Sequence, residues 1–265
     1  MGVQIFGDWA QGASHERVEK VCQDSWDKAD FVPGIFLATV ADGHGSDKSP
    51  YSDVGSKVAT KVFKKLMLEH YKNYEDESAF ETFLAREGDG KFAQIIDREW
   101  KRSIMDVQKA AGRDMTLPPE EIYRLYGSTL LGLAIFDEFV FAFQIGDGDI
   151  TYVDENTVEA VIEADKFLGV ETHSLCKIDA WKHAITMVKH KDIDENKPYM
   201  YMLTSDGFAN SYPTQEAYYT TCKGYFDLMR QHGVKAVKSN LRKWLIETSH
   251  EGCGDDITAV FAYNE

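Results

Sequence analysis

The sequence predicts an α+β fold in which antiparallel β-sheets are covered by α-helices, and three observations lead to it. Two apolar segments, 128–136 and 139–145, are separated by only two residues, which is typical of a β-hairpin. Further short apolar segments resemble strands, and segments with helical spacing of apolar residues lie between them. The chain has only six prolines and no Gly/Ser-rich linker, so we expect a single domain over residues 1–265.

Apolar periodicity places the other elements. Residues 31–41 are apolar and end in Asp-Gly-His-Gly, which predicts a buried strand followed by a tight turn. Apolar residues repeat every four positions over 54–67, which predicts a helix with one apolar face. Segment 155–197 mixes short β-like pieces with loop. The remaining predicted elements are a helix at 91–111, strands at 150–153, 199–204 and 257–263, and helices at 214–231 and 234–249.

The charge balance excludes two classes of partner. The 265 residues include 44 acidic and 29 basic side chains, for a formal net charge of −15. Such a chain repels nucleic acids and anionic membranes at long range, so we expect neither as a partner. Most of the excess carboxylates are expected on a solvated surface, and the others are candidate metal ligands.

Cysteine usage and apolar content predict a cytoplasmic protein, and we separately expect a monomer. None of the four cysteines belongs to a C-x-x-C pair, so no structural zinc site is indicated. In a chain of this size, scattered cysteines are typical of free thiols in a reducing compartment. The first eight residues lack the features of a secretory signal, and no apolar stretch approaches the roughly 20 residues that span a bilayer.

Aspartates recur beside glycines where the predicted strands end or begin. A buried strand brings the residue at its end to a shared rim, and a neighbouring glycine lets the backbone turn sharply and its carbonyl approach an ion. Carboxylate and carbonyl oxygens are the ligands that Mg²⁺ and Mn²⁺ prefer. The residues concerned are Asp24, Asp42 with Gly43, Asp147, Asp206, and Asp255 with Asp256.

Ordinary turns are the alternative explanation, because Asp-Gly is a common turn sequence. That explanation is adequate for one such site and less adequate for five sites at the mouths of apolar strands. An EF-hand is excluded at Asp147, because the sixth loop position is Tyr152 rather than glycine and the twelfth is Val158 rather than glutamate.

Seven short motifs occur in a characteristic order. They are Gly-Ala-Ser-His at 12–15, Cys-Gln-Asp at 22–24, Asp-Gly-His-Gly-Ser at 42–46, Tyr-Gly-Ser-Thr at 126–129, Gly-Asp-Gly at 146–148, Ser-Asp-Gly at 205–207 and Asp-Asp-Ile-Thr at 255–258. In this order they resemble the PP2C-like (PPM) family of metal-dependent protein serine/threonine phosphatases, and most closely its compact bacterial branch. The resemblance implies an α+β fold: a PP2C-like β-sandwich of two antiparallel sheets flanked by α-helices.

The resemblance also implies a centre of two Mn²⁺ or Mg²⁺ ions. Asp42 would bridge both ions, and Asp24 and the backbone carbonyl of Gly43 would complete the protein ligands of one. Asp206 and Asp255 would hold the other ion.

A third, weaker ion occurs in bacterial members, and Asp147 would help to hold it.

The implied reaction is hydrolysis of phosphoserine or phosphothreonine in a protein substrate, by a hydroxide that the metals bridge. Asp42 and His44 are therefore the predicted catalytic residues, and His44 matches the family's general acid, which protonates the leaving oxygen.

The phosphate-binding position departs from the family pattern. The family often has an arginine about five residues before the first aspartate, where this chain has Glu19. His15, Arg17 or Lys20 could replace that arginine, and we prefer His15 because it belongs to the branch motif. The last motif is usually Asp-Asn, so Asp256 is an extra carboxylate that could bind a metal or support a ligand.

Two other functions stay open at this point. One is a catalytically weak regulatory binding module, and the other is a phosphatase for small phosphorylated metabolites. Substrate choice is expected to depend on the flap at 154–198, whose sequence indicates no particular substrate.

Overall fold

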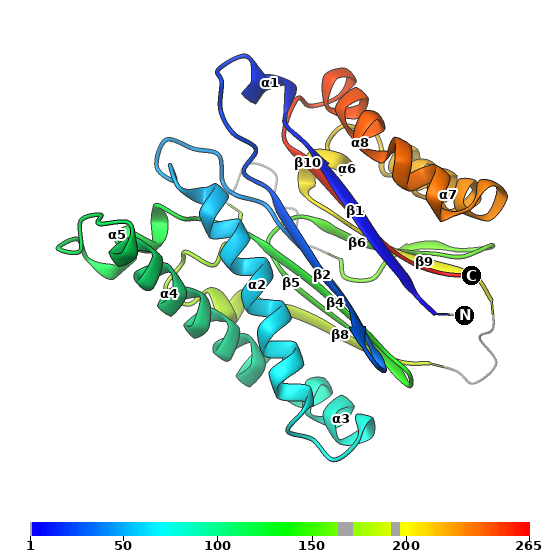
Figure 1. Ribbon diagram of the computed structural model, residues 1–265, viewed down its shortest axis with the longest axis horizontal. Coiled ribbons are helices and arrows are strands. Elements are labelled where there is room, and N and C mark those ends of the chain that lie inside the picture. Colours follow the sequence, from blue (N-terminus) through cyan, green and yellow to red (C-terminus); the bar gives the residue numbers. More distant parts are fainter. Residues whose placement is uncertain (1, 164–171, 192–196) are drawn as a thin grey trace.

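The protein is a sandwich of two five-stranded antiparallel sheets with helices on both outer faces (Figure 1). A computed structural model of the chain describes residues 2–163, 172–191 and 197–265. The strands of the first sheet are, in order, β1 (Gln4–Ala10), β10 (Ile257–Asn264), β9 (Tyr199–Thr204), β6 (Asp149–Val153) and β7 (Val158–Ala160). Those of the second are β2 (Ser25–Val32), β3 (Ile35–Ala41), β4 (Leu130–Phe136), β5 (Phe139–Ile145) and β8 (Ile185–His190).

The helices form two groups. Those on the side of the second sheet are α2 (Ser52–Tyr71), α3 (Glu77–Glu87), the π-helix η1 (Gly88–Phe92), α4 (Ala93–Ala110) and α5 (Pro119–Arg124). Those on the side of the first sheet are α1 (Ala13–Glu16), α6 (Asp206–Ala209), α7 (Gln215–His232) and α8 (Val234–Glu251). A single 3₁₀ turn, η2 (Ala180–His183), precedes β8.

Three apolar layers hold this arrangement together. One lies between the sheets, one between the second sheet and α2 and α4, and one between the first sheet and α7 and α8. Every residue of β4 and β5 is buried, because one face of each strand packs in the middle layer and the other against helices. This explains why these two strands are apolar at every position except Gln144 instead of alternating apolar and polar residues.

The predicted fold class is confirmed, and so is the hairpin around Asp137 and Glu138. One predicted strand was wrong in extent: segment 31–41 contains the end of β2, a turn and the whole of β3, and these two strands form a hairpin. Its turn contains Pro33 and Gly34, and Gly34 has the positive φ of +78° that favours glycine. The apolar composition continues across this turn and therefore conceals it.

Several elements were not predicted. These are β1, most of β2, α1, α3, α5 and α6. The predicted helix at 91–111 begins as a π-helix, and α4 proper starts at Ala93. In the flap, β8 is a regular six-residue strand paired with β5, where only short pieces were expected. The parts of the flap at 164–171 and 192–196 lie outside the described residues.

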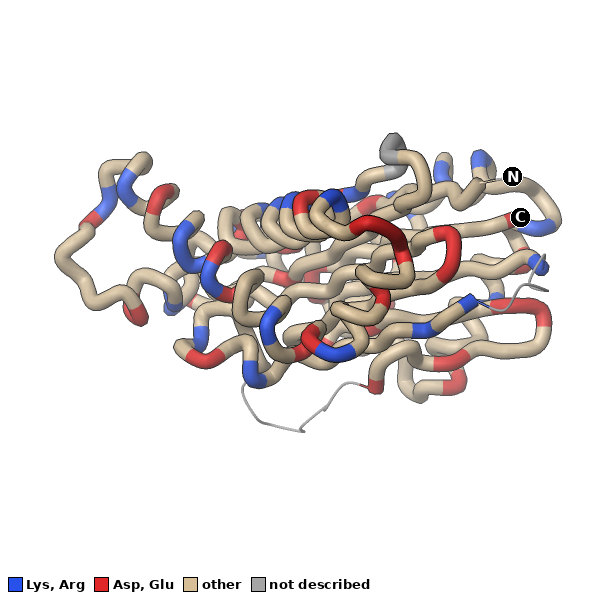
Figure 2. The backbone as a smooth tube through the Cα atoms, turned by 90° about the horizontal axis from the view of Figure 1, so that it is seen from below, with Lys and Arg blue, Asp and Glu red and all other residues tan. Residues whose placement is uncertain are grey.

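Charges of both signs are interspersed along the chain (Figure 2). None of the helices in the described ranges is long and apolar enough to cross a membrane.

Strand pairing brings the aspartate-bearing turns to one end of the sandwich. In the second sheet, the start of β2 pairs with the end of β3, so Ser25 lies opposite Ala41. In the first sheet, the start of β6 and the end of β9 pair, so Asp149 lies opposite Thr204. The segments that precede or follow these strand ends therefore meet at the same edge of their sheet.

Candidate metal centre

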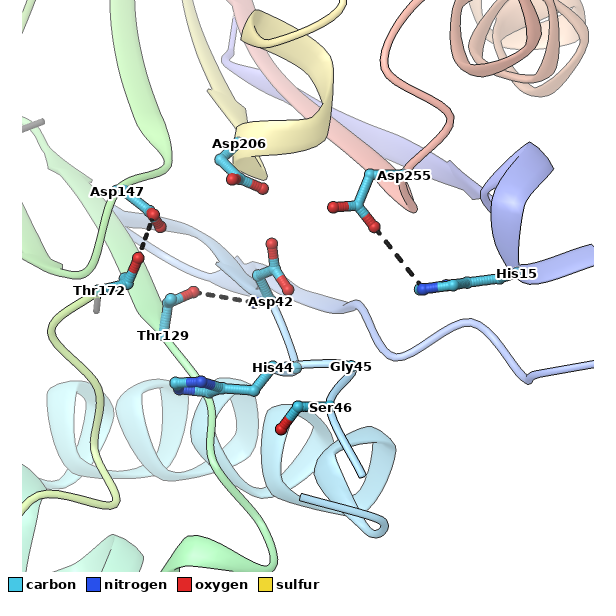
Figure 3. A pocket seen from close by; sticks show the side chains of 11 residues that line it. His15, Asp42, His44, Gly45, Ser46, Thr129, Asp147, Thr172, Asp206 and Asp255 are labelled. Carbon is cyan, nitrogen blue, oxygen red and sulfur yellow. Dashed lines mark hydrogen bonds and ion pairs between the residues drawn. The ribbon is translucent and has the colours of Figure 1, made fainter. Parts of the chain in front are cut away.

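A cavity of about 270 Å³ opens at this end of the sandwich (Figure 3). Four carboxylates and two imidazoles face it, and no lysine or arginine is among its described lining residues. The lining residues are His15, Asp42, Gly43, His44, Gly45, Ser46, Thr129, Asp147, Thr172, Asp206 and Asp255. All predicted site residues except Asp24 are in this set.

Two hydrogen bonds fix the backbone of Asp42 to the start of β4. The Asp42 N–H donates to Thr129 Oγ1 at 3.0 Å, and the Thr129 N–H donates to the Asp42 carbonyl at 2.8 Å. The His44 N–H donates to the Gly127 carbonyl at 3.1 Å, and Gly43 forms a β-bridge with Ser128. The Tyr-Gly-Ser-Thr motif therefore acts as a backbone clamp on the Asp-Gly-His turn.

Close packing explains the glycine after Asp42. A Cβ atom at Gly43 would lie 2.6 Å from the Gln23 carbonyl oxygen and 2.8 Å from that of Ser52. Both atoms belong to the backbone and cannot rotate away. Any other residue would push the Asp42 turn away from the segment that carries Asp24.

Asp24 is buried and lies outside the cavity lining. Ser205 Oγ donates to its Oδ2 at 2.7 Å, whereas Asp24 Oδ1 has no hydrogen-bond partner in the described part of the chain. Burial, followed by the nearby charge of Asp256, raises the pKa of Asp24 well above its usual range. A buried carboxylate oxygen without a donor is a group that a bound cation would satisfy.

Burial first, and then repulsion between the carboxylates, raises the pKa values of the aspartates in the cluster. Burial and then the charges of Asp24 and Asp206 raise the pKa of Asp42 well above its usual range. Burial and the charges of Asp147 and Asp255 raise the pKa of Asp206 to about 6. Without a cation, the cluster lowers this repulsion by keeping protons.

The donor set fits divalent metal ions of the hard class. Carboxylates and the Gly43 carbonyl supply oxygen ligands, and no cysteine lines the cavity among the described residues. As they stand, these residues do not form a group of three or more His, Cys, Asp or Glu side chains that could hold a metal ion. The carboxylates of Asp42, Asp147, Asp206 and Asp255 stand around the cavity (Figure 3).

Asp256 has a different role from its neighbour Asp255. It is 3% exposed and accepts hydrogen bonds from the backbone N–H groups of Gly12 and Gln23, both at 2.7 Å. Its Oδ1 also lies 2.9 Å from His15 Nδ1. Both of its oxygens are therefore engaged in holding the 12–23 segment, and it does not line the cavity.

His15 is the only one of the three candidate phosphate-binding residues that lines the cavity. Its Nδ1 faces Asp256, and its Nε2 lies 3.9 Å from Asp255 Oδ1 (Figure 3). Arg17 and Lys20 belong to the same segment but not to the lining.

Four lining residues were not predicted as site residues: Gly45, Ser46, Thr129 and Thr172. Thr129 was quoted only as part of a motif, and its hydrogen bonds to Asp42 explain that motif. Thr172 Oγ1 donates to Asp147 Oδ2 at 2.5 Å, which joins the flap to the β5–β6 turn. Gly45 and Ser46 were likewise quoted only within a motif, whereas no local pattern marks Thr172, because its role depends on a contact with Asp147.

Known proteins share both the sequence pattern and the fold. The sequence profile described as protein phosphatase 2C matches residues 11–246. No match was found among curated protein sequences.

Three solved structures illustrate the similarity of fold. The catalytic domain of the serine/threonine phosphatase PstP, in complex with two manganese ions, is 13% identical with a TM-score of 0.62, covering 100% of this chain and 99% of its own. RsbX in complex with magnesium is 14% identical with a TM-score of 0.55, covering 99% and 95%. PppA, a regulatory component of the type VI secretion system of Pseudomonas aeruginosa, is 17% identical with a TM-score of 0.57, covering 99% and 97%.

The family profile covers six of the seven motifs as well as most of the chain, so it confirms the resemblance that their order predicted. The chain belongs to the protein phosphatase 2C family.

Proposed function

We propose that the carboxylate-lined cavity hydrolyses phosphoserine and phosphothreonine in protein substrates with the help of divalent metal ions. The observation that carries this proposal is the group of aspartates whose pKa values are raised by burial and by one another, in a member of the phosphatase 2C family. Such a group is costly without cations and has the ligand chemistry of Mn²⁺ or Mg²⁺.

We assign the ligands as follows. Asp42 would serve both of two ions, Asp24 and the Gly43 carbonyl would serve one, and Asp206 and Asp255 would serve the other. The Asp42 carboxylate points toward Asp206 and Asp255 across the cavity, which supports its central place (Figure 3). Asp24 does not line the cavity, so its place in the set rests on its buried Oδ1, which lacks a donor.

Asp147 stands at the edge of the set. It faces the same cavity and is held by Thr172, which suits a ligand of a third ion. When bound, divalent ions supply an activated water and offset charge on the phosphoryl oxygens.

His44 is the proposed general acid. It lines the cavity, and its backbone is fixed to Gly127. Its ring packs beside Gly127, where an added Cβ would lie 2.8 Å from His44 Cδ2. The glycine therefore leaves room for the imidazole, which would donate a proton to the serine or threonine oxygen as that oxygen leaves.

His15 is the proposed phosphate-binding residue. Its Nδ1 lies 2.9 Å from Asp256 Oδ1, which leaves Nε2 on the side of the cavity. Since no lysine or arginine is among the described lining residues, His15 and the metal ions would take the role of the arginine that Glu19 replaces.

We also propose a monomer in a reducing, cytoplasmic compartment, without nucleic-acid or membrane partners. The four free cysteines and the net charge of −15 support this proposal.

Metal-dependent hydrolysis is the first test. We expect a phosphoserine peptide to be hydrolysed with Mn²⁺ or Mg²⁺ but not with chelator, and Asp206→Asn to lower kcat by about 100-fold or more. Asp106→Asn, an exposed aspartate of α4, is the matched control. Metal binding without hydrolysis would favour a binding module, and a clear preference for small phosphorylated metabolites would favour the other alternative.

Removal of one central charge should stabilise the metal-free protein. Asp42→Asn relieves repulsion in the cluster, so we expect its melting temperature in chelator to exceed that of the unchanged chain by about 2 °C or more, the shift for roughly 1 kcal/mol. Mn²⁺ should then raise the melting temperature of the unchanged chain and leave the variant nearly unaffected.

The pH dependence of this effect has a defined sign. The pKa of Asp206 in the folded protein is about 6, above its ordinary value, so the folded state binds more protons between those two values. Stability contributed by this group is therefore lost as pH rises toward and through 6. The increase in melting temperature that Asp42→Asn causes in chelator should be larger at pH 7.5 than at pH 5. An increase that is larger at pH 5 would contradict the proposed repulsion.

Leaving-group chemistry tests His44. When phosphoserine is hydrolysed, the serine oxygen leaves as an alkoxide that needs a proton. When p-nitrophenyl phosphate is hydrolysed, p-nitrophenolate leaves readily without one. We expect His44→Ala to lower kcat on a phosphoserine peptide by about 100-fold and to have a much smaller effect on p-nitrophenyl phosphate. His232→Ala, at an exposed site, should change neither rate. Equal losses on both substrates would remove the general-acid role.

Phosphate affinity tests His15. We expect His15→Gln to raise KM for a phosphopeptide and the inhibition constant of inorganic phosphate by about tenfold, because a charge-assisted hydrogen bond is lost. Arg17→Ala and Lys20→Ala should leave both constants near those of the unchanged chain. The assignment fails if phosphate inhibition is unaffected in His15→Gln or is weakened in either control.

A further inference from the structure

A second cavity, of about 520 Å³, lies on the outer side of α4, away from the carboxylate cluster. It is bounded by α4, by Tyr123 of α5, and by Ile178 and Trp181 in the segment before β8. We call it the α4 groove. None of the described residues that line it lines the metal cavity.

The charge of the α4 groove is opposite to that of the whole chain. Arg98, Lys101 and Arg102 line it together with a single carboxylate, Asp97, although the chain as a whole carries −15. Lys101 is held by Asp97 at 2.8 Å, so this pair is internally neutralised. The two arginines therefore give the groove its excess positive charge.

Both arginines are accessible. Arg98 is exposed and forms no ion pair with another described residue. The Arg102 side chain is 65% exposed, and its partner Glu99, at 2.6 Å, is shared with Lys65. Surface pairs of this kind are weak, so Arg102 can exchange its partner for an incoming carboxylate.

An apolar wall accompanies the positive charge. Ile178 is 58% exposed, one of few large apolar side chains with that exposure in the described ranges. Trp181 and Tyr123 line the same groove and are only partly buried. A groove with accessible arginines and aromatic walls fits a peptide that carries both carboxylates and apolar side chains.

The wall of the α4 groove is fixed to the metal cavity. The same segment begins at Thr172, which binds Asp147, and the Leu175 N–H then donates to the Ser128 carbonyl at 2.9 Å. At its far end, Lys101 Nζ donates to the Ile178 carbonyl at 2.5 Å. Ile178 is the sixth residue after Thr172, which places the two at most about 22 Å apart.

We propose that the α4 groove docks an acidic segment of the phosphoprotein substrate, several residues away from the phosphoserine in the metal cavity. This inference rests on the proposed phosphatase function and adds a specificity site to it. The occupant is identified by charge complementarity and by the short, anchored connection between the two cavities. Phosphate in the metal cavity and carboxylates in the groove would thus be recognised separately.

Two phosphoserine peptides test the proposal in the presence of Mn²⁺. One carries an Asp/Glu-rich segment with a leucine, six to ten residues from the phosphoserine, and the other carries Gly/Ser in its place. We expect the acidic peptide to have a KM about tenfold lower, and Arg98→Glu/Arg102→Glu to abolish the difference. Salt at 0.5 M should shrink the difference, because exposed charges are screened.

Matched controls separate docking from catalysis. Lys61→Glu/Lys109→Glu makes the same charge change at exposed sites outside the groove and should retain the preference. Hydrolysis of p-nitrophenyl phosphate should be equal in all variants. Equal KM values for the two peptides, or loss of the preference in the control variant, would overturn the proposal while leaving the phosphatase function intact.

A binding measurement keeps the inference testable if the protein hydrolyses neither peptide. A fluorescent acidic peptide without phosphate should bind the unchanged protein, and Arg98→Glu/Arg102→Glu should weaken binding by about tenfold in fluorescence polarisation. Binding that is equal in the unchanged chain and this variant would refute the groove. Binding of single-stranded DNA in preference to the peptide would assign it to another class of partner.

Discussion

The concentration of negative charge at one end of the sandwich is the constraint on which the rest of the structure depends. Several carboxylates that repel one another can share one small cavity only if the backbone that carries them cannot move apart. Here such a movement is prevented by two sheets whose central strands are buried on both faces and by hydrogen bonds that join the Asp42 backbone to Thr129. The stable core thus compensates for the carboxylate cluster, which destabilises the folded protein when no metal is bound.

The same constraint separates two kinds of acidic residue at the site. Asp255 is exposed to the cavity, whereas Asp256 is buried and engaged by two N–H groups and His15. Asp255 lines the cavity, and Asp256 holds the 12–23 segment at its edge. The exposure of each carboxylate, rather than its presence in the motif, distinguishes these roles.

The sequence predicts most of this where the signal is local. The Asp-Gly turns, the β4–β5 hairpin and the long amphipathic helices each lie within one short window of sequence. The division of 31–41 into two strands was missed, because the apolar run continues through Pro33 and Gly34. Thr172 could not be predicted to meet Asp147, because a contact over 25 residues leaves no periodic trace. Similarly, the fully engaged state of Asp256 depends on Gly12, 244 residues away.

The contact between Gly12 and Asp256 affects when the site can form during synthesis of the chain. The Gly12–Asp256 hydrogen bond and the pairing of β1 with β10 both join the beginning of the described chain to its end. During translation, the first of these partners leaves the ribosome on the order of tens of seconds before the second. The framework around His15 cannot close in the interval, so a nascent chain would carry most of the acidic residues of the site and yet remain inactive until Asp256 has been synthesised and has reached Gly12.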